Sequence, residues 1–176
     1  VDKRAIPTAW KLLGDSDPWL RHAARVAIES QPAEAWAERA LNEKDTDMAL
    51  TALIALARVG DSKLQTQLLN RLAEFHFDDL AADQRLALAR AYQLCFTRMG
   101  PPDAKVGNEV AKRIAVHFPS DDARVDRLTC ELLVYLGWTG VAEKTLALLN
   151  GDRSETEKLH YLFCLRHVKE GWTMEQ

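Results

Sequence analysis

His160, Cys164 and His167 have the side chains best suited to chemistry in this sequence, because they recur at positions i, i+4 and i+7. One helix could present all three on one side, and imidazole and thiolate groups with that spacing can bind a metal ion. No second cluster elsewhere in the sequence completes a set of four ligands. We therefore expect two histidines on the polar face of a helix and a packed thiol, with no metal ion and no other cofactor.

Glu157 and His160 have the Glu-x-x-His spacing of di-iron helical bundles, but such a site needs two copies of the motif and two further glutamates. Only one copy is present. The sequence also lacks the glycine-rich nucleotide loops, the Gly-x-Ser-x-Gly nucleophile motif and the His-Glu-x-x-His zinc motif. These observations predict a protein that is not an enzyme and has no catalytic residues.

Seven arginines fall on segments that we expect to be the second helices of helical hairpins. They are Arg21, Arg25, Arg58, Arg90, Arg98, Arg127 and Arg166. A ladder of guanidinium groups on one face could bind an acidic peptide or a phosphate. The alternative, which we favour for most of them, is that they form ion pairs between repeats with residues such as Asp15, Asp45 and Asp122.

The five tryptophans leave a similar choice between contact surface and core. They are Trp10, Trp19, Trp36, Trp138 and Trp172. Trp19, at the start of a helix, could be partly exposed and anchor a partner. Packing in the core or between repeats is the interpretation that we favour for all five.

The elements that would position these residues are helices, since apolar residues recur with the helical period and no strand-like alternation occurs. One stripe comprises Leu20, Ala23, Ala24, Ala27 and Ile28. We expect ten helices, at about residues 4–13, 18–30, 32–43, 46–59, 62–76, 81–99, 103–118, 122–136, 140–149 and 154–169. Asp17 before Pro18 predicts a capped helix start, and Ser154 with Glu157 has the spacing of a capping box.

Short links between these helices predict antiparallel hairpins. Residues 49–59 are apolar on nearly every side, which is typical of a helix buried between two neighbours. The second helices start near residues 18, 46, 81, 122 and 154, around the period of helical-hairpin repeats. The expected fold is all-α, a right-handed superhelix of about five degenerate hairpins that forms a single domain over residues 1–176.

Residues 12–28, with Asp17-Pro18 in the turn and Arg21 and Ala24 in the following helix, resemble the HEAT repeat. The resemblance implies that Asp17 caps the second helix of the hairpin and that Arg21 reaches acidic groups in an adjoining repeat. Asp45 matches the capping position in the next hairpin, where the proline and the arginine are absent. The specific pattern therefore covers about one repeat.

A narrower resemblance concerns residues 53–60, 85–102 and 160–173, which look like the helical-repeat region of large secreted bacterial proteins. Those proteins join a sugar-dehydrogenase-like propeller to such repeats and to a c-type haem domain. The resemblance implies a spacer between redox domains and a periplasmic or secreted location. The haem attachment motif Cys-x-x-Cys-His is absent, so this chain would hold no covalent haem.

The charge balance argues against nucleic acid as a partner. The chain of 176 residues has 23 basic and 26 acidic residues, a net charge of −3, whereas phosphate backbones are bound by strongly basic surfaces. A HEAT-like DNA glycosylase, the third alternative, would need such a surface. No apolar run approaches the length of about 20 residues that spans a membrane, so we expect no membrane insertion.

Cys95, Cys130 and Cys164 are an odd, scattered set in apolar helical stretches, so we expect buried free thiols. Because the chain begins at Val1 and ends shortly after Trp172, we expect a piece of a longer protein. The function that the sequence favours is a non-enzymatic scaffold. A curved surface of stacked hairpins would bind a protein partner or a neighbouring domain of the same polypeptide.

Overall fold

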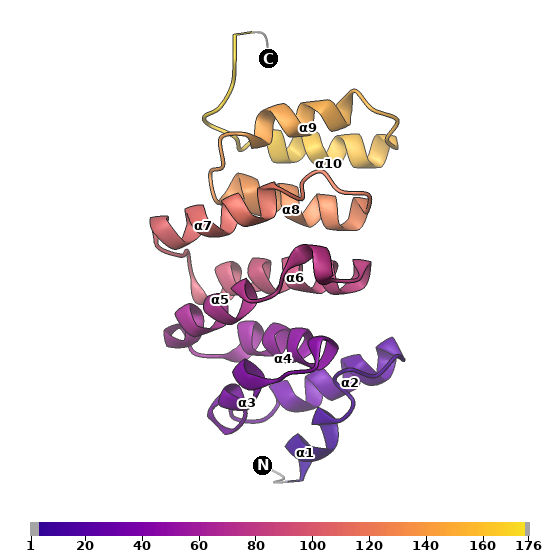
Figure 1. Ribbon diagram of the computed structural model, residues 1–176, viewed down its shortest axis with the longest axis vertical. Coiled ribbons are helices and arrows are strands. Elements are labelled where there is room, and N and C mark those ends of the chain that lie inside the picture. The colour runs from indigo at the N-terminus through magenta and orange to yellow at the C-terminus, as the bar shows by residue number, and fades with distance from the viewer. Residues whose placement is uncertain (1–3, 175–176) are drawn as a thin grey trace. The chain divides into compact units, whose positions relative to one another are not determined.

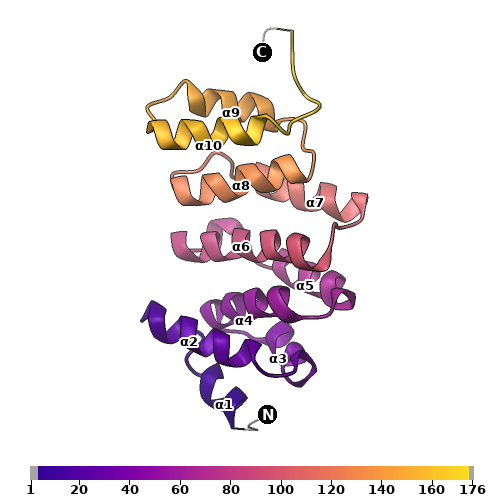
Figure 2. The ribbon, with the colours of Figure 1, turned by 180° about the vertical axis from the view of Figure 1, so that it is seen from behind.

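The computed structural model describes residues 4–174, and no strand occurs in this range. The prediction of an all-α protein is therefore confirmed. The helices form two compact units, one up to Pro101 and the other from Pro102 onward. Figures 1 and 2 show the helices from opposite sides.

The first unit has six α-helices, and most of them follow the expected boundaries. They are α1 (Ala5–Trp10), α2 (Pro18–Glu29), α3 (Ala37–Asn42), α4 (Thr46–Val59), α5 (Gln65–Ala73) and α6 (Ala82–Met99). Short 3-10 helices lie at Ala33–Ala35, Ser62–Leu64 and Phe77–Asp79. The helix expected over 32–43 is divided, because the backbone of Trp36, with φ −141° and ψ −8°, leaves the helical conformation before α3 begins.

The second unit has four α-helices, which are α7 (Ala104–Ala115), α8 (Ala123–Tyr135), α9 (Val141–Leu149) and α10 (Glu155–Leu165). Helix α8 contacts α7, α9 and α10, and α9 also contacts α10. The last helix ends four residues earlier than expected, at Leu165 instead of 169. The helices of each unit are therefore those that the apolar period predicted, with shorter ends.

Side-chain caps determine where several of these helices begin. The Asp17 carboxylate accepts a hydrogen bond of 2.8 Å from the Trp19 backbone N–H, and Asp45 accepts one of 2.9 Å from that of Met48. Ser154 and Glu157 form the expected capping box of α10. Each cap satisfies N–H groups that have no partner within the helix, so the predicted caps at these starts are confirmed.

Helix α4 forms the centre of the first unit. Its buried residues are Ala49, Leu50, Ala52, Leu53, Ala55, Leu56 and Ala57. The helix contacts α2, α3, α5 and α6, so neighbours cover it on several sides. The alanines on its surface allow those helices to approach closely. The predicted burial of residues 49–59 is confirmed for most of the segment, whereas Val59 at its end is 42% exposed.

The stripe expected on α2 is only half correct. Ala24 and Ile28 are buried, whereas Leu20 is 45% exposed and Ala23 is also exposed. The physical reason is that α2 contacts α1 and α4, which cover one side of the helix. The uncovered side presents Trp19 and Val26 to solvent.

Candidate functional site

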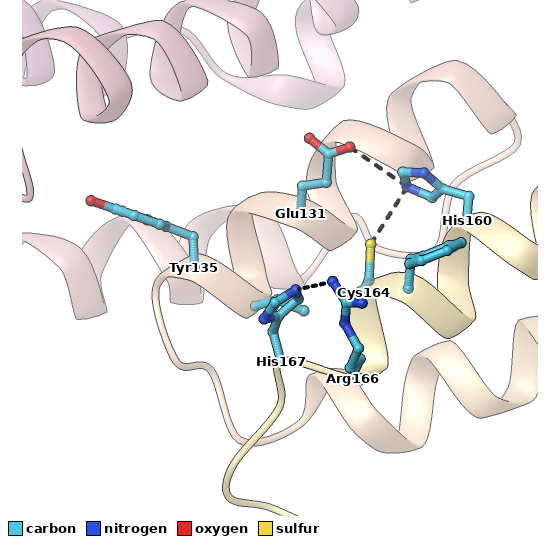
Figure 3. A pocket seen from close by; sticks show the side chains of 8 residues that line it. Glu131, Tyr135, His160, Cys164, Arg166 and His167 are labelled. Carbon is cyan, nitrogen blue, oxygen red and sulfur yellow. Dashed lines mark hydrogen bonds and ion pairs between the residues drawn. The ribbon is translucent and has the colours of Figure 1, made fainter.

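A cavity of about 450 Å³ lies between α8 and α10 in the second unit. Its lining residues are Glu131, Val134, Tyr135, His160, Phe163, Cys164, Arg166 and His167. Figure 3 shows that the labelled side chains come from two helices and from the segment that follows α10. Cationic, aromatic and thiol groups thus surround one space, which we call the α8–α10 cavity.

His160 has three polar neighbours, and all of them approach the same ring nitrogen. His160 Nε2 lies 3.6 Å from Cys164 Sγ, 3.8 Å from Glu131 Oε1 and 3.4 Å from the backbone oxygen of Arg127. Figure 3 shows the first two contacts meeting at this atom. A catalytic base that activates a nucleophile uses one nitrogen for the nucleophile and the other for an orienting acid. The arrangement around His160 therefore lacks the geometry of a nucleophile–base–acid relay.

His167, the third residue of the i, i+4, i+7 cluster, does not join the other two. Its Nε2 lies 3.1 Å from Nη2 of Arg166. Across residues 4–174, no group of three or more histidine, cysteine, aspartate and glutamate side chains could hold a metal ion. The cluster is divided because the backbone leaves the helix after Leu165, before it reaches His167.

Glu157, the other half of the Glu-x-x-His motif, binds residues at the start of its own helix. Its carboxylate accepts hydrogen bonds from the Ser154 backbone N–H at 3.2 Å and from the Ser154 hydroxyl at 2.7 Å. It also lies 3.5 Å from Arg153 Nη1. These contacts make Glu157 a capping residue of α10.

Cys130 on α8 and Cys164 on α10 are buried thiols on two helices that contact each other. A hydrogen bond from Cys164 lowers the pKa of the Cys130 thiol, and the same bond, together with burial, raises the pKa of Cys164. Cys130 Sγ also lies 3.5 Å from the Thr145 hydroxyl. All three cysteines are free and buried, as the sequence predicted.

The arginines of the expected ladder are divided between the two units. Arg25 and Arg58 both pair with Glu29, the latter at 2.8 Å, so one carboxylate on α2 lies between guanidinium groups from α2 and α4. Arg21 donates to the backbone oxygens of Asp15 and Ser16. The shared anion is thus a glutamate, whereas the sequence had suggested aspartates such as Asp15, Asp45 and Asp122.

The remaining arginines lie nearer to solvent. Arg90 on α6 donates to Gln93, and Arg98 at the end of the same helix is exposed. Arg127 on α8 is half-buried. The exposed Arg166 lies with its guanidinium carbon 5.3 Å from the centre of the Phe163 ring.

Two tryptophans are buried, Trp138 is half-buried and two are exposed. Trp10 and Trp36 are at most 1% exposed, as favoured from the sequence, but Trp19 is 81% exposed and Trp172 is 41% exposed. Packing in the core is thus the wrong interpretation for Trp19. At the first turn of α2 its side chain lies on the side that α1 and α4 do not cover.

Helix α10 has apolar residues on two opposite sides. Tyr161, Cys164 and Leu165 are buried, whereas Leu159, Leu162 and Phe163 are between 52% and 61% exposed. Both sets have the spacing i, i+3, i+4, and each set therefore shares one face of the helix. The buried set starts two residues after the exposed set, which is about half a turn, so the two faces are opposite. We call Leu159, Leu162 and Phe163, together with the 53% exposed Tyr135 of α8, the α10 face.

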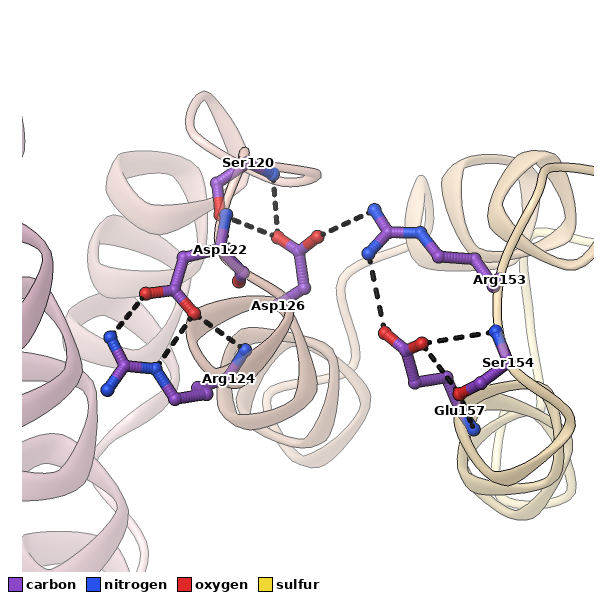
Figure 4. Close-up of polar contacts among 7 residues, drawn as sticks. All are labelled: Ser120, Asp122, Arg124, Asp126, Arg153, Ser154 and Glu157. Carbon is purple, nitrogen blue, oxygen red and sulfur yellow. Dashed lines mark hydrogen bonds and ion pairs between the residues drawn. The ribbon is translucent and has the colours of Figure 1, made fainter.

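A buried carboxylate connects α8 to the start of α10. Asp126 is fully buried and accepts hydrogen bonds from the Ser120 backbone N–H at 2.6 Å, the Ser120 hydroxyl at 2.8 Å and Arg153 at 3.2 Å. Burial raises the pKa of Asp126 despite these bonds. Figure 4 shows Arg153 between Asp126 and Glu157. The network joins the loop before α8 to the loop before α10.

Within residues 4–174, no helix has the length and apolar character needed to cross a membrane. Comparisons with protein-family models, with curated proteins and with solved structures gave no significant match.

Proposed function

We propose that the protein is a non-enzymatic interaction module that binds a protein partner through the α10 face and the adjoining α8–α10 cavity. The observation that carries the proposal is the exposure of Phe163, Leu159 and Leu162 beside a cavity of about 450 Å³. Contiguous apolar surface next to polar groups is typical of protein contact sites. Isolated exposed apolar residues would carry no such meaning.

The chemistry of the α10 face suits a partner with an apolar anchor and acidic flanking groups. Aromatic residues and arginine are enriched where protein interfaces lose their water. Phe163 and Tyr135 supply the aromatic surface, and Arg166 and His167 lie at the cavity wall. A carboxylate of the partner near Arg166 would gain a charge-assisted hydrogen bond.

The proposal includes the HEAT-like arrangement, in which second helices of successive hairpins stack into a right-handed superhelix. Contacts inside each unit support it, since α4 contacts both α2 and α6, and α10 contacts α8. In such an array each hairpin buries its apolar side against the next and leaves an extended surface for binding. An interaction module built this way needs no enclosed catalytic pocket.

The geometry around His160 supports a role other than catalysis. Its contacts with Cys164 and Glu131 use a single ring nitrogen, so no relay leads from an acid through the imidazole to the thiol. The thiol that faces the cavity is also the one whose pKa is raised. A cysteine nucleophile would require the opposite shift.

Phe163→Asp tests the proposal, with Val116→Asp as a matched control at a 76% exposed apolar residue outside the cavity. Wild type and both variants would be expressed at native level in the source cells and recovered with their bound proteins, which quantitative mass spectrometry would identify. We expect one or a few proteins to be recovered with wild type and with Val116→Asp. Their recovery with Phe163→Asp should fall at least about tenfold, because a charge in an apolar contact weakens binding by more than about 1.4 kcal/mol.

Equal recovery with the three proteins would contradict the proposal. The chain would then be a plain spacer, the alternative suggested by the narrower sequence resemblance. Circular dichroism of Phe163→Asp would show that the variant is folded, as expected for a side chain that is 61% exposed.

A further inference from the structure

Helix α2 of the first unit presents an apolar side to solvent. Trp19 is 81% exposed, Val26 is 47% exposed and Leu20 is 45% exposed, and Ala23 between them is also exposed. Positions 19, 23 and 26 have the spacing i, i+4, i+7, which places them on one face of the helix. Figure 2 shows α2 at the edge of the first unit, next to α4. We call Trp19, Leu20, Ala23 and Val26 the α2 face.

The order of side chains along the α2 face suits close contact with a second helix. Trp19 and Val26 lie about 10 Å apart along the helix axis, at the two ends of the face. Ala23 lies between them, and its small side chain leaves room for another helix to approach. In an antiparallel pair centred near Ala23, Trp19 of each helix would therefore lie beside Val26 of the other.

The start of α2 is acidic. Residues 15–21 comprise two aspartates and one arginine, an excess of one negative charge. Asp17 is exposed and Asp15 is half-buried. Arg21 donates to the backbone oxygens of Asp15 and Ser16. Both carboxylates therefore lie at the end of the helix that also bears Trp19.

The other end of α2 has the opposite charge balance. Glu29 pairs with Arg25 on the same helix and with Arg58 of α4, the latter at 2.8 Å. Two guanidinium groups thus surround one carboxylate, and the Arg58 side chain is 35% exposed. An antiparallel pair of α2 helices would place the acidic start of each beside this cationic end of the other, whereas a parallel pair would place like charges together.

We propose that the α2 face binds the α2 face of a second copy of this chain, in an antiparallel pair with a two-fold axis near Ala23. Because the pair is symmetric, the contact between Trp19 and Val26 and the contact between opposite charges each occur twice. The face covers one short helix, which is less than the roughly 800 Å² per partner of a standard interface. The dimer should therefore form only at high protein concentration. The inference concerns the first unit and stands independently of the α10 face.

Sedimentation velocity of the full chain tests the inference. We expect the mass to rise from that of one chain, 19.8 kDa, toward that of a dimer as the protein concentration increases. Trp19→Asp should raise the dissociation constant at least about a hundredfold, because a tryptophan anchor is lost from both copies and each loss weakens binding at least about tenfold. A negative charge in the first turn of a helix is favourable, so this variant should stay folded, which circular dichroism would show.

Two exposed positions in the second unit provide matched controls. Val116→Asp and Phe163→Asp also place a carboxylate at an exposed apolar position, 76% and 61% exposed respectively. Both should dimerise like wild type, since neither residue belongs to the α2 face. Added salt should raise the dissociation constant of the wild-type dimer, because it screens the paired charges.

Single cysteines on the exposed side of α2 report the orientation of the pair. Ala23→Cys, near the axis, should form a disulfide between two copies on mild oxidation, which dithiothreitol removes. Ser30→Cys should not, because an antiparallel pair holds the two copies of position 30 about 20 Å apart along the helix axis, too far for a disulfide. The three native cysteines are buried.

The proposal would be overturned if the wild-type chain kept the mass of one chain at every concentration, in which case the α2 face would be a contact site for a different molecule. A dimer that Trp19→Asp leaves intact, or that Phe163→Asp abolishes, would also overturn it. Disulfide formation by Ser30→Cys in preference to Ala23→Cys would contradict the antiparallel arrangement.

Discussion

Replacing Arg153 with methionine should destabilise the second unit, because it would leave the Asp126 carboxylate buried without its cationic partner. Asp126 is fully buried, and Arg153 lies 3.2 Å from it with a side chain that is 23% exposed. Removing one partner of a buried ion pair costs about 3–5 kcal/mol. The two hydrogen bonds from Ser120 remain, so we expect a loss of about 2–3 kcal/mol in the free energy of unfolding.

Urea unfolding, monitored by the hydrogen exchange of peptides from α8 and α10, measures this loss within the second unit. A domain of this size shifts its melting temperature by roughly 4–8 °C per kcal/mol, so the melting temperature should also fall by roughly 8–24 °C. Lys158→Met is the matched control, since Lys158 pairs with the 86% exposed Glu155. An exposed pair contributes at most about 1 kcal/mol.

The double variant Asp126→Asn and Arg153→Met should recover more than half of the loss, because no buried charge is then left unpaired. The cost of Arg153→Met should also shrink as the pH falls toward 4. Burial raises the pKa of Asp126 above its ordinary value of 3.8, so this carboxyl becomes neutral in the folded state before it does so in the unfolded chain. A loss equal to that of Lys158→Met, or one that the double variant deepens, would refute the reasoning.

Three further predictions concern acid stability, the core and nucleic acid. The hydrogen bond from Arg124 lowers the pKa of Asp122 from 3.8 to about 2. The contribution of the Asp122 carboxylate to stability is therefore present above pH 3.8 and is lost as the pH falls to about 2. Asp122→Asn, which can still cap α8, should flatten this part of the plot of unfolding midpoint against pH. Leu53→Ala should lower the free energy of unfolding in urea by about 2–5 kcal/mol, because Leu53 is fully buried. Val59→Ala should lower it by less than about 1 kcal/mol, because Val59 is 42% exposed. Equal losses would contradict the central place of α4. The full chain, with a net charge of −3, should give no mobility shift with duplex DNA at low salt, and a shift that added salt abolishes would contradict the exclusion of nucleic acid.

The elements were predictable because local rules determine them. Asp17, Asp45 and Ser154 satisfy backbone N–H groups within three residues of themselves, so the sequence nearby contains the whole interaction. The segment at residues 49–59 is apolar on nearly every side, which predicts burial for most of it without knowledge of the neighbouring helices.

The surfaces were harder to predict because they depend on which neighbour covers which side. The stripe on α2 and the two apolar sides of α10 look alike in sequence, yet Leu20 and Phe163 are exposed and Ile28 and Tyr161 are buried. The spacing i, i+3, i+4 shows that residues share a face, but not whether another helix lies on it. Helix α10 has apolar residues on two opposite sides, and this pattern is the one signal in the sequence that could have indicated an uncovered apolar face.

Long-range charge partners were also outside the reach of local patterns. Glu29 receives Arg25 from its own helix and Arg58 from α4, and Arg153 contacts Asp126 across 27 positions. Only the packing of the helices brings these groups together. Asp126 has both polar and apolar neighbours in the sequence, so no local pattern predicts that its carboxylate is fully buried.

Photo-crosslinking from the α10 face tests the proposed function most directly. A photoreactive phenylalanine derivative would replace Phe163 in one protein and the exposed Lys112 of α7 in a second, and both would be irradiated in the source cells. The proposed interaction predicts that the derivative at position 163 forms a discrete adduct with one partner protein. The derivative at position 112 should not form this adduct, and adding Leu162→Asp should abolish it. The same adducts from both positions, or none from position 163, would contradict a binding role for this face.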